Sequence, residues 1–119
     1  MSIRLVTFDE LPEPERTEPA ADRRLRGDPR QQVWNLYGLA GDRFFAGRWA
    51  STTGSWRVRY TEHEFCHVLS GRMRIASQDG GVWTFVAGDS FVVPAGFEGT
   101  WEVLEDAVKL YAIFEPGGT

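Results

Sequence analysis

Residues 60–71, YTEHEFCHVLSG, bring together several side chains that can bind metals or transfer protons. The segment holds both histidines of the chain, His63 and His67, its only cysteine, Cys66, and the acids Glu62 and Glu64. Imidazole, thiolate and carboxylate groups are the usual protein ligands of zinc and related metals. The residue types in this stretch therefore raise the question of whether it holds a metal ion.

Strand alternation separates these side chains. In an extended chain, successive residues point to opposite faces, so Glu64 and Cys66 share one face and His67 lies on the other. His63 falls on the turn that precedes the strand, where we expect it to be solvated. A bulge would shift this alternation by one residue. Without a histidine on its face, Cys66 is interpreted as a buried small apolar residue rather than as a nucleophile.

The elements that must position these residues are short strands. From about residue 31 onward, apolar alternation is interrupted every few residues by turn formers such as Gly41-Asp42, Gly71 and Asp79-Gly80-Gly81. We expect strands over 32–38, 43–51, 55–61, 64–70, 72–77, 82–86, 90–94, 100–105 and 107–115. The glycines, Gly71 among them, are expected where the chain reverses. Many short strands without a helical pattern predict an all-β sandwich or barrel.

The 119 residues predict one domain, with residues 1–30 as an N-terminal strand and irregular arm and 31–119 as the barrel. The stretch 10–30 carries dense charge of both signs and four of the chain's six prolines, which favours irregular structure. Within it, DRRLR (residues 22–26) is open to two interpretations, a helical turn or a solvated charged loop.

Composition excludes several classes of partner. A net charge of −4 and a pI near 5.1 argue against a nucleic-acid surface. No apolar run approaches the roughly 20 residues that span a bilayer. The single cysteine excludes an internal disulfide, and the first residues lack the apolar core of a signal peptide. We therefore expect a cytoplasmic protein that binds neither nucleic acid nor membrane.

Two segments resemble the motifs of the cupin superfamily. The family's first motif is written G-x5-H-x-H-x(3,4)-E-x6-G, and Glu64 and Gly71 stand at its E-x6-G spacing. Gly88, Pro94 and Gly96 in GDSFVVPAG match the first half of the second motif, G-x5-P-x-G-x2-H-x3-N. Residues 40–115 are most similar to the ureidoglycine aminohydrolase-type cupin domains. The resemblance implies a single-domain double-stranded β-helix, the jelly-roll cupin barrel, whose mouth accepts a small ligand.

The resemblance also implies where a metal site would lie. The family's ligand positions fall on Val58, Tyr60 and Glu64, and the last histidine position falls on Gly99 or Thr100. Only Glu64 is a usual ligand, because valine cannot coordinate and a tyrosine phenol is protonated at neutral pH. We therefore expect no metal and no other cofactor. The alternative is a divalent metal (Mn, Ni, Zn or Fe) held weakly through Glu64.

The barrel mouth predicted in this way is an aromatic pocket with one carboxylate. Its expected ligand-binding residues are Trp49, Trp56, Val58, Tyr60, Glu64 and Thr100. Glu64 and Tyr60 are the candidate catalytic residues, the first as an anchor for an amine or as a general base. Lys109 is predicted to lie outside the pocket, because the apolar residues that alternate with it from 108 to 114 are expected to form the core.

Three functions fit these expectations. The first is a cupin that binds a small organic molecule and lacks the usual metal site. The second is an enzyme related to ureidoglycine aminohydrolase, or another lyase or isomerase, that acts on a small polar amine or ureido compound through Glu64 and Tyr60. The third is a structural module with a filled barrel. We also expect a homodimer, in which the arm 1–30 could reach a partner.

Overall fold

Every regular element of the protein is a β-strand in the computed structural model, which describes residues 2–39, 41 and 43–116. The strands are β1 Glu15–Thr17, β2 Arg24–Arg26, β3 Gln31–Gly38, β4 Phe44–Ser51, β5 Gly54–Arg59, β6 His63–Ser77, β7 Val82–Val86, β8 Ser90–Val93 and β9 Glu98–Phe114. The all-β prediction is confirmed. Among the described residues, no helix is long and apolar enough to cross a membrane. Asp42 of the expected turn and residues 117–119 of the predicted barrel domain lie outside the described residues.

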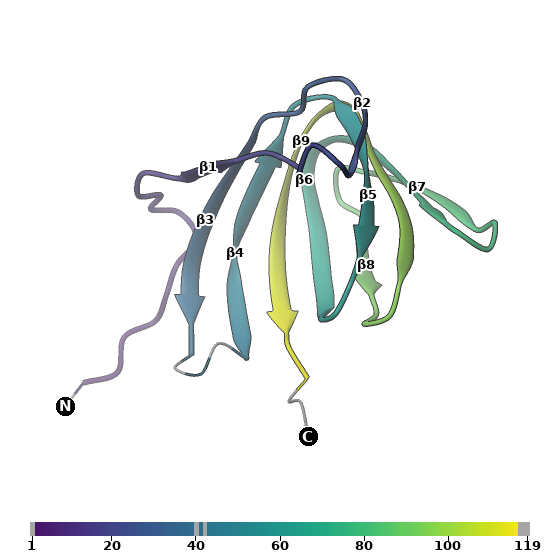
Figure 1. Cartoon of the computed structure of the whole chain (residues 1–119). Helices are drawn as coiled ribbons and strands as arrows, with labels where there is room; N and C mark the ends of the chain where they lie inside the picture. Colours follow the sequence, from purple (N-terminus) through teal and green to yellow (C-terminus); the bar gives the residue numbers. More distant parts are fainter. Residues whose placement is uncertain (1, 40, 42, 117–119) are drawn as a thin grey trace.

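Two long strands, β6 and β9, run through both layers of the barrel. The second half of β9 pairs with β4 and with the first half of β6, which also pairs with β8. The first half of β9 pairs with β5 and with the second half of β6, which also pairs with β7. One layer therefore has the order β1-β3-β4-β9-β6-β8 and the other β2-β5-β9-β6-β7. Figure 1 shows the strands curling into this open barrel.

Gly71 bends β6 and does not end it, which corrects the prediction of two strands with a reversal between them. The backbone at Gly71 has a φ of 88°, and a Cβ there would overlap the carbonyl oxygen of Asp106 on β9. Only glycine allows this close approach. The register of β6 against β9 shifts on both sides of Gly71, and such irregularities bend a strand. The strands expected over 100–105 and 107–115 are likewise one continuous strand, β9.

The core lies between the two layers and follows the predicted alternation along β5 and β6. Trp56 is buried on β5, and Cys66, Met73 and Ile75 are buried on β6, while Arg57 and Arg74 point to solvent. The other buried members of this cluster are Val68, Val93, Trp101, Val103 and Ala107. Glu64 shares the buried face of β6, with 5% of its surface exposed. The inner face of the barrel therefore contains an acid, as the sequence predicted.

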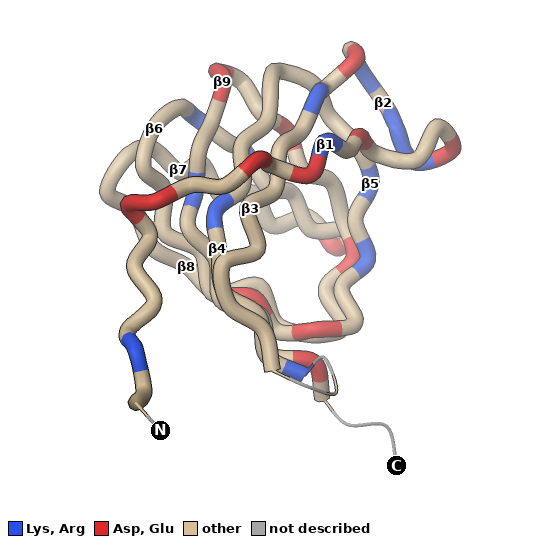
Figure 2. Tube along the Cα trace, turned by 90° about the vertical axis from the view of Figure 1, so that its left-hand side faces the viewer, with Lys and Arg blue, Asp and Glu red and all other residues tan. Residues whose placement is uncertain are grey.

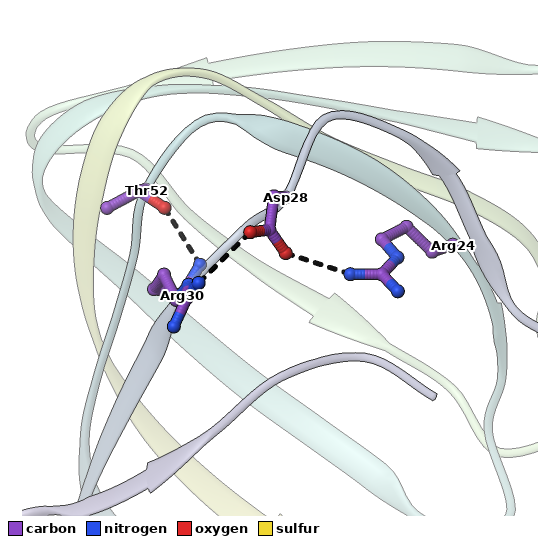
Figure 3. Close-up of polar contacts among 4 residues, drawn as sticks. All are labelled: Arg24, Asp28, Arg30 and Thr52. Atoms are coloured by element: carbon purple, nitrogen blue, oxygen red, sulfur yellow. Dashed lines mark hydrogen bonds and ion pairs between the residues drawn. The ribbon is translucent and has the colours of Figure 1, made fainter. Parts of the chain in front are cut away.

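The segment 15–30 is more regular than predicted, because both layers extend into it. β1 pairs with β3, and β2 pairs with β5. Asp22 and Arg23 of DRRLR lie in a hydrogen-bonded turn, where the amides of Arg23 and Arg24 donate to the Ala20 carbonyl, and residues 24–26 form β2. Asp28 accepts hydrogen bonds from Arg24 and Arg30, and the Arg30 amide donates to Thr52 Oγ1 at 2.8 Å (Figure 3). Pro29 between them is buried. Residues 2–14, before β1, form no strand and run clear of the barrel (Figure 2).

Candidate functional site

A cavity of about 180 Å³ opens between β4, β5, β6 and β9 on the inner face of the barrel. It is lined by Gln31, Trp49, Trp56, Val58, Tyr60, Glu62, Glu64, Trp101, Lys109 and Ile113. The register of the strands explains why distant residues meet here. Lys109 pairs across the sheet with Trp49 of β4 on one side and with Val68 of β6 on the other. Glu64 lies four residues before Val68 on β6, and therefore on the same face of the strand.

A buried ion pair forms the polar centre of this cavity. Lys109 Nζ lies 2.8 Å from Glu64 Oε2, and the two side chains are 5% and 7% exposed. The second carboxylate oxygen, Oε1, accepts a hydrogen bond of 2.8 Å from the hydroxyl of Tyr60. Both oxygens of Glu64 are therefore bound to groups of the same chain, and the acid is stabilised inside the barrel by an internal cation.

Aromatic rings surround the ammonium group of Lys109. Nζ lies 4.5 Å from the ring centroid of Trp101 and 4.9 Å from that of Trp49, distances at which the cation is attracted to the ring faces. Nζ also donates to Cys66 Sγ at 3.4 Å. The ring of Tyr60 stacks on Trp101 with centroids 6.5 Å apart. These contacts hold the ammonium in one position and exclude bulk water from it.

The environment keeps Cys66 and Tyr60 protonated. Burial, and then the charge of Glu64, raises the pKa of Tyr60. Burial raises the pKa of Cys66 to about 12, although Lys109 acts in the opposite direction. Burial lowers the pKa of Lys109, but its electrostatic and hydrogen-bond interactions with Cys66 and Glu64 raise it, and the net shift is upward. At neutral pH Cys66 is a thiol, so the Glu64 carboxylate is the counter-ion of the Lys109 ammonium.

The structure places five of the six expected ligand-binding residues around the cavity: Trp49, Trp56, Val58, Tyr60 and Glu64. The prediction for Thr100 is wrong. Thr100 pairs with Arg57 and Ala76 on the opposite face of the sheet, whereas its neighbour Trp101 faces inward. Trp101 Nε1 is buried without a hydrogen-bond partner among the described residues. Trp101, which lines the cavity, thus has a ring donor left unsatisfied in the described part of the chain.

The prediction for Lys109 is also wrong, because both faces of β9 are apolar. Ala107, Lys109 and Tyr111 face the barrel interior and are at most 7% exposed. The apolar set beginning at Val108, which was expected to form the core, lies on the outer face of the sheet. Lys109 is the only lysine in a chain whose other basic residues are arginines. That composition, together with an inward-facing acid that requires a partner, is the signal that could have identified the pair.

The residues at the expected metal position do not fit a divalent cation. Glu64 is the only carboxylate among them, and the ammonium of Lys109 already lies 2.8 Å from it. A side chain at Gly99 would overlap the carbonyl oxygen of Ala76, so this position cannot carry a ligand without a backbone shift. Within residues 2–39, 41 and 43–116, no three His, Cys, Asp or Glu side chains form a group that could hold a metal.

Neither histidine lies in the cavity. His67 faces outward, as predicted, and its Nδ1 lies 2.8 Å from Ser90 Oγ. His63 is exposed at the start of β6, where its Nδ1 accepts a hydrogen bond from the amide of Ala95 and its ring stacks on Phe114. The histidines therefore support the ends of strands and are not close to Glu64.

A second, larger cleft of about 560 Å³ lies along β7 and β8. Its walls are mainly apolar, and include Trp83, Phe85 and Phe91, of which the last two stack with centroids 3.8 Å apart. Its polar residues, Ser77 and Asp79, are hydrogen-bonded to each other. Because it contains no buried charged group, this cleft offers less specific recognition than the cavity at Glu64.

Residues 39–111, more than half of the chain, match the EutQ-like cupin domain. No curated protein matches the sequence. Among solved structures, a DUF861-family protein of unknown function from Pseudomonas syringae pv. tomato matches with a TM-score of 0.80 and 22% identity over 91% of this chain. The chain spans only 46% of that protein.

Two further solved structures are similar. The EutQ protein of Clostridium difficile matches with a TM-score of 0.65 and 18% identity, over 73% of this chain and 64% of that one. A DUF861-family protein from Thermotoga maritima matches with a TM-score of 0.53 and 28% identity, over 54% of this chain and 73% of that one. These similarities agree with the predicted jelly-roll fold.

Proposed function

The chain belongs to the family of EutQ-like cupin domains, and on this basis we propose that its barrel binds a small polar organic molecule beside Lys109 and Glu64. The single observation that carries the proposal is the buried ion pair in the wall of a cavity. A barrel filled only for stability would be expected to hold apolar residues at these positions, because a buried pair gives little or no net stability over apolar replacements. The pair therefore suggests recognition.

The chemistry of the wall indicates the class of ligand. Glu64 and Lys109 neutralise each other at the centre of the cavity, and the one other charged lining residue, Glu62, accepts a hydrogen bond from Thr61 Oγ1. The centre of the cavity therefore does not select for a strong net charge. A ligand can accept hydrogen bonds from Lys109 or from Trp101 Nε1, and it can donate to Glu64, whose carboxylate has further acceptor positions. At about 180 Å³ the cavity is smaller than the roughly 300–1,000 Å³ of ordinary ligand sites. A small neutral amide, ureido or hydroxy-carbonyl compound fits these conditions.

Tryptophan fluorescence tests this proposal directly, because Trp49, Trp56 and Trp101 line the cavity. Acetamide, urea and glycolamide are titrated into the protein, and we expect a saturable spectral change with at least one of them. Glu64→Gln should weaken that binding at least tenfold. Thr100→Val is the matched control, because Thr100 is next to Trp101 but faces away. No saturable response to any small amide or hydroxy-carbonyl compound would instead favour the filled structural barrel.

Ethanolamine is an informative further probe, because a similar Salmonella protein is named as an ethanolamine utilization protein. Its ammonium group would lie beside that of Lys109, and like charges repel at short range. We therefore expect ethanolamine to bind more weakly than glycolamide, which has a similar size and carries no charge. Tighter binding of ethanolamine would show that the ligand replaces Lys109 as the partner of Glu64.

The alternative is an enzyme related to ureidoglycine aminohydrolase, or another small-molecule lyase or isomerase. The contact between Tyr60 and Glu64 supports it, since a carboxylate held between a phenol and an ammonium can accept a proton from a substrate. Release of ammonia from ureidoglycine in the presence of manganese is the test. We expect none, because Glu64, the one carboxylate at the family's ligand positions, is already paired with Lys109. If turnover occurs, Glu64→Gln should abolish it and Tyr60→Phe should reduce it.

A further inference from the structure

A third cleft, of about 400 Å³, lies on the outside of the barrel beside β5. Arg57 and Arg59 line it, and because they alternate along β5 with the inward-facing Trp56, the cleft lies on the outer face of this strand. The space exists because the residues beside Arg57 are short. Thr100 pairs with it on β9, and Ala76 follows on β6. The cleft is thus separated from the cavity at Glu64 by the sheet itself.

Three arginines from two elements meet at this cleft. Arg57 and Arg59 are two positions apart on β5, so their side chains leave the same face roughly 7 Å from each other. Arg23, the third, lies in the turn before β2, and its carbonyl accepts a hydrogen bond of 2.9 Å from the Arg57 amide. Figure 2 shows the basic positions of β2 and β5 on the same side of the molecule. The guanidinium groups therefore approach the cleft from two directions.

The acids of this face leave two of these arginines without a counter-ion. Glu98, the one acid that lines the cleft, is bound by Arg59 Nε at 3.2 Å. Glu102, on the same face of β9, pairs with two other arginines, one on β2 and one on β6. Neither Arg23 nor Arg57 forms an ion pair within the part of the chain that the structure describes. A chain of net charge −4 therefore has a cleft with an excess of positive charge.

We propose that this cleft binds a small phosphate monoester, with the phosphate group between Arg23 and Arg57. A guanidinium binds phosphate through paired N–H donors. Because phosphate is tetrahedral, its oxygens can accept from arginines that approach from two elements, whereas the two oxygens of a carboxylate lie in one plane. A volume of about 400 Å³ is within the range of small-molecule sites, so there is room for a short organic group as well. The proposal is independent of what the cavity at Glu64 binds.

Calorimetric titration of the full chain with glycerol 3-phosphate, in a buffer of low salt without phosphate, tests the site. We expect one molecule to bind per chain, with a dissociation constant below about 1 mM. Glycerol, which carries no charge, should not bind. Succinate carries two charges on planar carboxylates and should bind at least tenfold more weakly. Absence of saturable binding of glycerol 3-phosphate, or equal binding of succinate, overturns the proposal.

Inorganic phosphate is the probe that separates an ester site from a site for the free ion. The ester can also contact the walls of the cleft around its phosphate, so we expect it to bind more tightly than the ion. Inorganic phosphate that binds as tightly as glycerol 3-phosphate would show that the organic group makes no contact. That result overturns the assignment of an ester as the ligand.

Substitution of single arginines tests which residues hold the phosphate. Arg57→Gln and Arg23→Gln should each weaken the binding of glycerol 3-phosphate at least tenfold. Arg72→Gln is the matched control, because it removes the same charge from an exposed arginine of β6 that pairs with Glu105 outside the cleft. An equal loss in all three variants would mean that only the overall charge attracts the ligand, and it overturns the site. Circular dichroism checks that each variant is folded.

Arg57→Lys keeps the positive charge but loses the planar fork of the guanidinium. We expect this variant to bind glycerol 3-phosphate several-fold more weakly than the wild type. Equal affinity would contradict recognition by the guanidinium. The NMR signals of the arginine Nε–H groups give a second measurement, on the wild-type chain. The signals of Arg23 and Arg57 should shift on titration while that of Arg72 does not, and shifts confined to other arginines overturn the proposal.

Discussion

Lys109 Nζ and Glu64 Oε2 lie 2.8 Å apart inside the barrel, with more than nine-tenths of each side chain buried. The pair joins β6 to β9, the two strands that run through both layers. An internal ammonium thus lies beside the acid that, by the family resemblance, would have held a metal. This relationship determines the electrostatics of the cavity.

Removal of one partner of this pair should be far more damaging than removal of both. Lys109→Met leaves Glu64 buried without a counter-ion, and we expect a loss of about 3–5 kcal/mol in the free energy of unfolding. Glu64→Gln combined with Lys109→Met should recover most of that loss. Urea unfolding of the wild type, both single variants and the double variant measures the coupling. Additive losses would show that the two residues are not energetically coupled.

Gly99 should be intolerant of any side chain, because its missing Cβ faces the carbonyl oxygen of Ala76. We expect Gly99→Ala to lower the free energy of unfolding by about 1–3 kcal/mol, the usual result of overpacking. Gly38→Ala is the matched control, since a Cβ there would meet Phe45 at an ordinary 3.4 Å. Thermal unfolding compares the two. Equal stability of both variants would contradict the close approach of β9 to β6.

The stability of the fold should fall as the pH rises from about 9 to about 12. The pKa of Cys66 rises from 9.0 to about 12 on folding and that of Tyr111 from 10.0 to about 12, and burial is the main cause for both. Between these values the folded state holds more protons than the unfolded state, so added base favours unfolding. The upward shift of the pKa of Lys109 acts in the same direction.

Urea unfolding at pH 8, 10 and 11 measures this dependence. Cys66→Ala removes one of the contributing groups, so its stability should fall less steeply with pH than that of the wild type. Tyr37→Phe is the control, because Tyr37 is 40% exposed on the outer face. If the free energy of unfolding of Cys66→Ala falls with pH as steeply as that of the wild type, the thiol has the same pKa in the folded and the unfolded protein.

Chemical labelling should find the single lysine and the single cysteine unreactive in the native protein. Lys109 and Cys66 are 4% and 0% exposed, and the thiol is protonated at neutral pH. We expect amine-reactive esters to modify the α-amino group and thiol reagents to modify nothing until urea is added. Mass spectrometry of peptides locates the label. Rapid modification of Lys109 without denaturant would mean that the cavity is open to reagents of that size.

The sequence by itself determined the fold class, most strand positions and the inward-facing acid. Alternation along 55–60 groups Trp56 with Tyr60, and alternation along 64–68 groups Glu64 with Cys66, because side chains of a strand alternate between faces. The resemblance to the cupins indicated that these groups face the barrel interior. The same argument placed His67 outside. These features depend only on residues that are adjacent in the sequence, so the local sequence is enough to predict them.

Only the tertiary structure decided the partner of Glu64 and the continuity of β6 and β9. Lys109 is 45 positions from Glu64, and it was misplaced because β9 has two apolar faces, so that alternation alone could not tell the inner face from the outer one. Thr100 was expected in the cavity from the position of the family's motif, but the register of β9 against β5 and β6 turns Trp101 inward instead. Gly71 was expected to reverse the chain, but its effect depends on the backbone of Asp106 packed against it. The partner of Glu64, the orientation of Thr100 and the continuity of β6 all depend on pairing between strands that are distant in the sequence. No local sequence pattern predicts that pairing.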